Sequence, residues 1–480
     1  MKTGIYMLTS ILFIICTSLF STGRSYGQPT REKIREMESL IESGSSGELL
    51  SVKMDIEEDY LAMARHNIEQ YRKSGAVLVF ADRNGQPLEN IEVRIDQVSQ
   101  DFLFGALLFE IAGHAGSQPY KEDEFKDRFK TLFNLGILPF YWASYERTAG
   151  NPLWQRNQSA MEWALESGIT LKGHPLGWTS PAGTPRWLLG LPPETATDLY
   201  RARIQNNVIG YKGKIDIWDV VNEPVNTVPW DVALADTDND NSLRYNVTGY
   251  TTGDFAGWVE QSYRWAYEAN PDGDYILNEY FTLAIPEIRD RFYDLISELV
   301  RRNTPISGIG IQGHEPREMW FSPVEMYKTF DLYKQFGLPL HITEFIPQSS
   351  GKNITGWREG VWTEETQAEF AEQFYTLAFG HPSTASITWW AFTDRNVWLE
   401  GGGLLDAEYN PKPVYDRLKK LIKYEWMTKN IHLVTDHDGR ISFRGFFGRY
   451  DVSVTKPDGS TVKFDVHLQE GETNYWQFTL

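Results

Sequence analysis

The chain has 480 residues, of which 41% are hydrophobic and 23% are charged. This length allows one large core with a small accessory module, and it excludes a peptide or a single small module. The 46 basic and 65 acidic side chains give a net charge of −19, which predicts no nucleic-acid partner because such a surface repels phosphate backbones.

Residues 1–27 have the pattern of a secretory signal peptide, because a long apolar run follows Lys2 and ends in small residues. The single cysteine, Cys16, lies in this run. Cleavage of the signal peptide would remove it, which predicts a mature chain without disulfides. A lipoprotein anchor at Cys16 is disfavoured by Ile15, where small residues are usual. We expect a secreted protein, whether extracellular, periplasmic or held at the cell surface, and no later apolar run predicts a membrane span.

The next segments change from helical to extended patterning. Residues 28–75 are charged and helix-prone and predict a helical lead-in. Residues 76–82 and 91–97 alternate as strands do, and Asn84-Gly85 between them is a turn dipeptide. Residues 76–100 therefore predict a β hairpin.

Residues 101–428 alternate short β-branched or aromatic runs with amphipathic helices. Eight such units in about 320 residues predict an α/β fold of the (β/α)8 TIM-barrel type, with a doubly wound open sheet as the main rival. The eight expected strands are residues 102–109, 135–142, 170–178, 216–221, 275–280, 308–312, 338–345 and 386–392.

The C-terminal segment, residues 429–480, has no helical period but alternates between turn dipeptides. Neither this segment nor the hairpin at 76–100 is large enough to form a sandwich alone. We therefore predict that the two pack together into one small accessory β domain beside the barrel.

Two expected barrel strands end in glutamates. The fourth strand delivers Asn222 and Glu223 before Pro224, and the seventh delivers Glu344. Barrel active sites lie at the carboxyl ends of the strands, so these glutamates can form the carboxylate pair that glycoside hydrolysis requires. A single strand-end carboxylate often only caps the following helix, but the combination with Asn222 and Pro224 favours a site.

Five stretches on these strands resemble glycoside hydrolase family 10, the endo-β-1,4-xylanases. They appear in the family's order along the chain, as Gly173-His174-Pro175-Leu176-Gly177-Trp178, Trp218 to Pro224, Gly310 to His314, Thr343-Glu344-Phe345 and Trp389 to Asp394. The resemblance implies a retaining double-displacement mechanism on xylan-type polysaccharide.

The resemblance also implies a role for each matching residue. Glu223 would be the acid/base, Glu344 the nucleophile, and Asn222 the partner of the sugar 2-hydroxyl. We expect the acid to start protonated and the nucleophile ionised, with their proximity separating the two pKa values. His174 and Trp178 would line the −1 sugar site. Gln312 and His314 would orient the two catalytic glutamates, and Trp390 and Trp398 would cover the site from above.

Three departures concern the distal sugar sites. The family's Glu-Asn-x-Met-Lys-Trp segment is replaced by residues 139–144, Pro-Phe-Tyr-Trp-Ala-Ser, so Tyr141 and Trp142 are predicted to contact substrate instead, with Tyr145 and Glu146 as further candidates. Ile346 stands where many members have an aspartate that supports the histidine, and Thr179 replaces another histidine. The reaction is therefore better determined than the glycan.

No cofactor or metal is predicted. The nine histidines lack the His-Glu-x-x-His spacing, no Gly-rich phosphate loop follows a strand, and Asp236 to Asp240 lacks the rest of a calcium loop. Two alternatives to a xylanase remain: the same chemistry on another β-glycan or glycoside, and a glycan-binding barrel without turnover.

Overall fold

The computed structural model describes residues 31–43, 46–113, 121–227, 252–395, 397–456 and 458–480. The predicted signal peptide at 1–27 and the acidic stretch at 236–240 lie outside these residues. Within the described part of the chain, no helix combines the length and the hydropathy that a membrane crossing needs.

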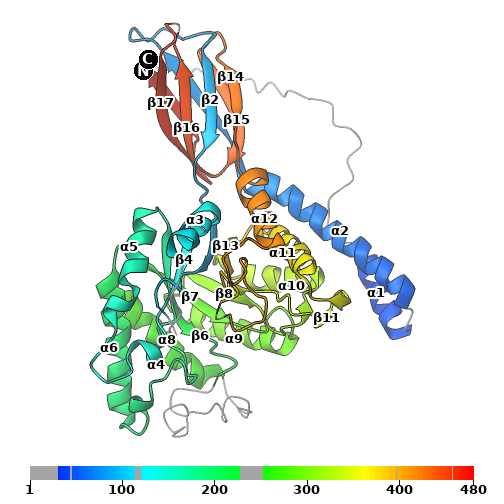
Figure 1. Ribbon diagram of the computed structural model, residues 1–480, viewed down its shortest axis with the longest axis vertical. Helices are drawn as coiled ribbons and strands as arrows, with labels where there is room; N and C mark the ends of the chain where they lie inside the picture. Colours follow the sequence, from blue (N-terminus) through cyan, green and yellow to red (C-terminus); the bar gives the residue numbers. More distant parts are fainter. Residues whose placement is uncertain (1–30, 44–45, 114–120, 228–251, 396, 457) are drawn as a thin grey trace, which may run out of the picture.

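Eight parallel strands close into a barrel in which each strand pairs with its neighbours in chain order and the last strand returns to the first (Figure 1). This closure confirms the (β/α)8 prediction and excludes the open sheet. The strands are β3 (Leu103–Leu107), β4 (Leu135–Pro139), β5 (Thr170–His174), β6 (Ile217–Asn222), β7 (Asp274–Glu279), β8 (Gly308–Gly313), β10 (Leu340–Phe345) and β13 (Thr384–Trp389).

Helices surround the barrel, and several begin at sequence signals that fix their first turn. Thr363 and Thr366 form a capping box at the start of α11, Ser322 caps α10, and prolines occupy the first turns of α6, α9, α10 and α12. The elements around the barrel are α3 (Glu122–Leu132), α4 (Trp142–Tyr145), η2 (Trp154–Asn157), α5 (Gln158–Glu166), η3 (Arg186–Leu188), α6 (Pro193–Tyr211), α8 (Thr252–Ala269), α9 (Pro286–Arg301), α10 (Pro323–Lys334), α11 (Glu364–Phe379), α12 (Pro413–Lys420) and η4 (Leu421–Glu425). A small sheet of β9 (Met319–Trp320), β11 (Asn353–Gly356) and β12 (Gly360–Val361) lies beside them.

Two helices precede the barrel, as the charged N-terminal segment predicted: α1 (Arg31–Ser43) and α2 (Ser46–Tyr71). The apolar face of α2, with Ile56, Ala64 and Ile68, is buried in the same core as the barrel helices. At the end of α2, the Arg72 guanidinium donates hydrogen bonds to the carbonyls of Phe379, His381 and Thr384. This helix is therefore attached to the barrel along its length.

The remaining strands form two sheets that share a second apolar core. One sheet has the order β15-β1-β18 and the other β14-β2-β16-β17. Their bounds are β1 (Lys73–Ala81), β2 (Glu92–Gln97), β14 (Ile431–Val434), β15 (Arg440–Phe446), β16 (Gly448–Thr455), β17 (Thr461–Leu468) and β18 (Tyr475–Thr479). The N- and C-terminal segments are thus interleaved in one β sandwich, which agrees with the predicted accessory domain.

The predicted hairpin is wrong in its pairing. A tight turn does form at Asn84-Gly85, with backbone hydrogen bonds from Asp82 to Gln86 and from Leu88 to Phe80. Beyond this turn, however, β1 and β2 lie in opposite sheets. Each strand pairs instead with C-terminal strands, β1 with β15 and β18, and β2 with β14 and β16. This arrangement lets both apolar faces, for example Phe80 and Ile95, point into the core between the sheets.

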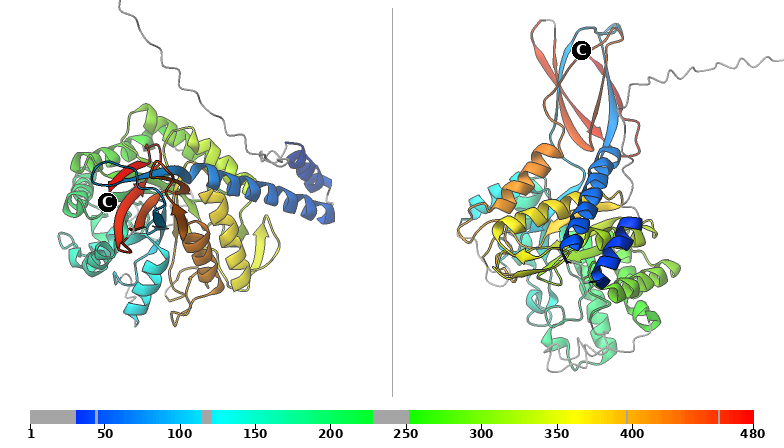
Figure 2. Two further views of the ribbon diagram at one scale, coloured as in Figure 1. Left: turned by 90° about the horizontal axis from the view of Figure 1, so that it is seen from above. Right: turned by 90° about the vertical axis from the view of Figure 1, so that its right-hand side faces the viewer.

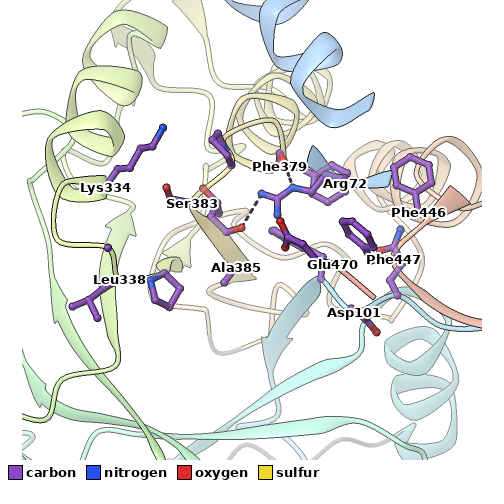
Figure 3. Close-up of a pocket in the computed structure, with 16 residues that line it drawn as sticks. Arg72, Asp101, Lys334, Leu338, Phe379, Ser383, Ala385, Phe446, Phe447 and Glu470 are labelled. Carbon is purple, nitrogen blue, oxygen red and sulfur yellow. Dashed lines mark hydrogen bonds between the residues drawn. The ribbon is translucent and has the colours of Figure 1, made fainter. Parts of the chain in front are cut away.

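The sandwich stands against the amino-terminal end of the barrel strands rather than its flank (Figures 1 and 2). A cavity of about 550 Å³ lies at this junction, lined by Phe102 and Thr384 at the starts of barrel strands and by Phe446 and Glu470 of the sandwich. Figure 3 shows the Arg72 guanidinium in the middle of this junction. The carboxyl ends of the strands, where barrel sites form, therefore lie at the opposite end of the barrel from the sandwich.

Candidate active site

A cavity of about 840 Å³ lies at the carboxyl ends of the barrel strands. Its lining comes from the segments that follow β3, β4, β5, β6, β8, β10 and β13, so distant parts of the sequence meet there. Of the eleven residues predicted for the site, nine line this cavity: Tyr141, His174, Trp178, Asn222, Glu223, His314, Glu344, Trp390 and Trp398.

Glu223 and Glu344 line this same cavity, and both side chains are almost entirely buried. Glu344 belongs to β10, whereas Glu223 follows directly after β6. The backbone of Glu223 has a φ of 54°, in the left-handed region that non-glycine residues rarely adopt. Its N–H donates to the carbonyl of Asn278 at 2.7 Å, which holds this conformation and turns the carboxylate into the cavity.

A continuous chain of side-chain amides joins the two carboxylates. Asn278 Nδ2 donates to Asn222 Oδ1 and to Glu344 Oε1, each at 2.7 Å. Gln312 Nε2 lies 3.5 Å from Asn222 Oδ1 and 3.3 Å from Glu223 Oε1. Gln312 is not part of the cavity wall but supports it from behind. The amide chain fixes both carboxylates relative to Asn222.

Each carboxylate also has a ring N–H partner. Trp178 Nε1 donates to Glu223 Oε2 at 2.9 Å, and His314 Nε2 lies 3.2 Å from Glu344 Oε2. Burial lowers the pKa of His314 to about 4, so the ring is neutral and Nε2–H is the donor to Glu344. His314 Nδ1 has no partner among the described residues, in agreement with the apolar Ile346 in place of a supporting aspartate.

The pKa of Glu344 differs from the expectation of a fully ionised nucleophile. Burial raises this pKa to about 7, with a smaller rise from the negative charge of Asp219, while His174 and the Asn278 hydrogen bond oppose the rise. The carboxyl is therefore divided between its two protonation states near neutral pH.

Beneath the carboxylates lies a buried ion pair that the sequence analysis missed. Asp219 Oδ2 accepts from Lys172 Nζ at 2.8 Å and from His174 Nδ1 at 2.7 Å, and the three residues are at most 3% exposed. Burial alone would raise the pKa of Asp219, but Lys172 and His174 hold it below its usual value. The contact to Asp219 fixes the His174 ring so that its other face lines the cavity.

Glu279, at the end of β7, is a third buried carboxyl that the sequence analysis did not single out. It accepts hydrogen bonds from the backbone N–H groups of Val225 and Tyr280 and from Asn226 Nδ2. Burial, followed by the negative charge of Glu223, raises its pKa to about 8. These bonds fix the turn after Glu223, and Glu279 does not line the cavity. The strand-end sequence Asn278-Glu279 was the signal that could have identified it.

Aromatic rings form the walls of the cavity, as predicted for a site that binds the faces of sugars. Trp390 packs edge-on against His174, with ring centroids 4.8 Å apart, and Tyr141 contacts the other side of His174 at 5.4 Å. Trp398 is 44% exposed and lies 5.2 Å from the His314 ring. Trp390 is thus buried, whereas Trp398 is partly open to solvent.

Trp142 is not placed at the cavity, which corrects its prediction as a substrate contact. Strand β4 ends at Pro139, and the chain turns into α4 at Trp142, so this side chain points beneath the surface. Its Nε1 donates to Glu146 at 2.8 Å, and its ring packs on Trp187 and Tyr200. Tyr145 and Glu146 likewise lie outside the cavity lining.

One group of residues in the described part of the chain has the composition of a metal site. Ligand atoms of Asp436, His437 and Asp438 lie within 4.8 Å of one another on an exposed turn of the sandwich. However, Asp436 Oδ1 already accepts the backbone N–H groups of Asp438 and Arg440. This carboxylate closes the turn, and the group offers no enclosed cation site.

The comparisons with known proteins agree with this geometry. A model of glycosyl hydrolase family 10 matches residues 139–421. The endo-1,4-beta-xylanase B of Thermotoga neapolitana is 28% identical over 273 residues, which are 55% of this chain and 72% of that protein. The anti-sigma-I factor RsgI6 of Acetivibrio thermocellus is 23% identical over 416 residues, 86% of this chain, and the chain spans only 49% of that relative.

Among solved structures, xylanase 10B from Thermotoga petrophila RKU-1 in complex with xylobiose has a TM-score of 0.54 and 22% identity, covering 68% of this chain and 95% of that one. At this identity, the likeness supports the barrel fold. The family model covers more than half of the chain and includes β6 and β10, whose carboxyl ends carry the two glutamates. The chain therefore belongs to glycosyl hydrolase family 10.

Proposed function

We propose that this chain is a secreted, retaining endo-glycoside hydrolase that cleaves β-1,4-xylosidic bonds in xylan-type polysaccharide. The observation that carries the proposal is the pair Glu223 and Glu344, which line one cavity and are joined through Asn222, Asn278 and Gln312. The substrate class follows from the names of the relatives, several of which are endo-1,4-beta-xylanases.

In the proposed mechanism, Glu344 attacks the anomeric carbon while Glu223 donates its proton to the departing glycosidic oxygen. The Glu344–carbon bond forms as the carbon–oxygen bond breaks, giving a glycosyl-enzyme. Glu223, now a carboxylate, then removes a proton from water, which displaces Glu344 and returns the original anomeric configuration. Asn222 lies between the two carboxylates, where its side chain can meet the 2-hydroxyl of the reacting sugar.

The direct test compares hydrolysis of xylan and aryl β-xylosides by the wild type and by Glu344→Gln. We expect Glu344→Gln to lose turnover. The matched control is Glu57→Gln, which should keep turnover, because Glu57 is a buried glutamate of α2 that binds Arg358. The product anomer followed by NMR should be β. An α product, or equal activity in Glu344→Gln, would contradict the mechanism.

The acid role has a separate test. Glu223→Ala should slow substrates with poor leaving groups far more than activated aryl glycosides, because only the former need a proton on the departing oxygen. Equal losses on both substrates would remove Glu223 from this role. If xylan is not hydrolysed but another glycoside is, the substrate assignment is wrong and the proposed reaction still holds. Binding of glycans without hydrolysis would favour a glycan-binding barrel.

A further inference from the structure

One end of the active-site cavity carries cationic side chains. Arg147, which follows α4, and Arg395, which follows β13, both line the cavity, and they come from the segments after β4 and β13, the two neighbours of β3 in the barrel. This concentration contrasts with the net charge of −19 of the whole chain. The two arginines give this end of the cavity a local positive charge that attracts anionic groups.

The acidic neighbours of these arginines are held elsewhere. Glu146 accepts from the Gly150 N–H and from the Trp142 indole, and it does not line the cavity. Asp394 binds Lys412 Nζ at 3.1 Å and the backbone N–H of Gly403. Neither carboxylate is therefore directed at the cavity beside its arginine neighbour.

One carboxyl does line this end of the cavity and partly balances the charge. Glu110 lies 4.0 Å from Arg395, and it accepts hydrogen bonds from the hydroxyls of Thr393 and Tyr409. Burial raises the pKa of Glu110, while its two hydrogen bonds and the positive charge of Arg395 oppose the rise. Arg395 also donates to the Tyr409 hydroxyl at 2.9 Å, so its guanidinium is held in place at the wall.

Arg147 has no ion-pair partner among the residues that the structure describes, and a second arginine lies behind it. Arg156 donates to the carbonyl and hydroxyl of Ser144, another lining residue. The pKa of Arg156 is lowered by burial and by the positive charge of Arg147, which places the two guanidinium groups within electrostatic range. Two arginines thus line this end of the cavity together with the carboxyl of Glu110, and a third arginine, Arg156, lies behind Ser144.

We propose that this end of the cavity binds a sugar substituent that carries a carboxylate, of the uronic-acid class, and that Arg147 and Arg395 are its specificity-determining residues. The proposal rests on the proposed function and narrows its substrate to acidic glycans. The forked guanidinium matches a carboxylate geometrically, and the neighbouring Phe109, Tyr141 and Trp390 rings suit the apolar face of the sugar.

The test uses a xylo-oligosaccharide that bears one glucuronic-acid branch and its carboxyl-reduced counterpart, which differ in charge and keep the same ring. We expect kcat/KM of the wild type to favour the acidic substrate by about fivefold, the upper range for an exposed ion pair. This ratio should fall toward one in Arg147→Gln, invert in Arg147→Glu, and remain largely intact in Arg147→Lys. High salt should reduce the ratio in the wild type.

The control is Arg83→Gln, which removes the same charge from an exposed turn of the sandwich and should leave the ratio unchanged. Equal kcat/KM for the two substrates in the wild type, or a ratio indifferent to Arg147, would overturn the proposal.

A binding measurement separates this proposal from the failure of the proposed function. Titration calorimetry on Glu344→Gln should show tighter binding of the acidic oligosaccharide, and the preference should be lost in Glu344→Gln with Arg147→Gln. If the wild type hydrolyses neither oligosaccharide but this binding preference persists, the hydrolase proposal fails and the anionic subsite stands. Absence of any binding preference would refute the subsite even if hydrolysis is found.

Discussion

Lys172→Met tests whether the buried ion pair beneath the carboxylates stabilises the barrel. Methionine has nearly the length of lysine and no charge, so the substitution removes the cation without opening a large cavity. Asp219 would keep only the His174 contact, because its Oδ1 has no partner among the described residues. Asp219, which is 0% exposed, would then lose its ion pair with Lys172, whose Nζ lies 2.8 Å from Oδ2.

The expected cost follows from the burial of this pair. Removing one partner of a buried ion pair typically costs about 3 to 5 kcal/mol, because the other charge remains unpaired in a medium of low dielectric constant. If the barrel unfolds as one cooperative unit, this loss of free energy corresponds to a decrease of about 4 to 8 °C in its melting temperature. Lys172 also lowers the pKa of Glu344, so its removal should move the acidic limb of the pH–activity profile to higher pH.

Circular dichroism melts and pH profiles of kcat/KM measure the two effects. The matched control is Lys212→Met, since Lys212 pairs with Asp272 at 3.7 Å on the surface and should contribute less than about 1 kcal/mol. In Lys172→Met with Asp219→Asn, the losses should be less than additive, because the asparagine leaves no buried charge. A melting temperature within about 1 °C of the wild type, with an unchanged pH profile, would refute the reasoning.

Three further predictions follow from single side chains. Because burial raises the pKa of Glu344 to about 7, kcat/KM should fall below pH 7. The stability that the protonated carboxyl contributes is present below its unfolded pKa and is lost as the pH rises through 7. Thermal melts of Glu344→Gln from pH 4 to 8 should therefore show a smaller decline in stability than melts of the wild type. Gly173→Ala should destabilise the barrel by about 1 to 3 kcal/mol in urea unfolding, because a Cβ there overlaps the Trp218 ring, whereas Gly75→Ala meets open space and should not. Arg72→Met should leave three carbonyls without their donor and cost about 3 kcal/mol, measured by urea unfolding; unchanged stability would mean that water replaces the guanidinium.

The barrel could be predicted from the sequence because its signals are local. Each parallel strand is a short apolar run followed by a helix, so the period changes at each boundary, and β4, β5 and β8 begin at the expected residues. Glu223 and Glu344 could be found because a polar residue at the end of an apolar run stands out. The chain order of barrel strands then places such residues around one opening.

The sandwich pairing and the interior network could not be predicted in the same way. The partners of β1 and β2 lie more than 300 residues away in sequence, so nothing local distinguishes a hairpin from two strands in opposite sheets. Lys172 lies within β5 and Asp219 within β6, and their pairing requires these two adjacent strands to be in register. Trp142 was misplaced because one turn of helix, α4, reverses the direction of a side chain that an extended strand would have presented to the cavity.

Burial is the main cause of the raised pKa of Glu344, and the contacts of this carboxylate explain why the rise is only partly offset. The positive charge of Lys172 is bound to Asp219, and the side chains that bond directly to Glu344 are Asn278 and the neutral His314. Neutral donors offset only part of the cost of burying a carboxylate. In the proposed double displacement, positive charge develops at the anomeric carbon beside Glu344 and favours its ionised form at that moment. The missing counter-charge is thus supplied by the transition state rather than by the protein, so this electrostatic interaction stabilises the transition state more than the ground state.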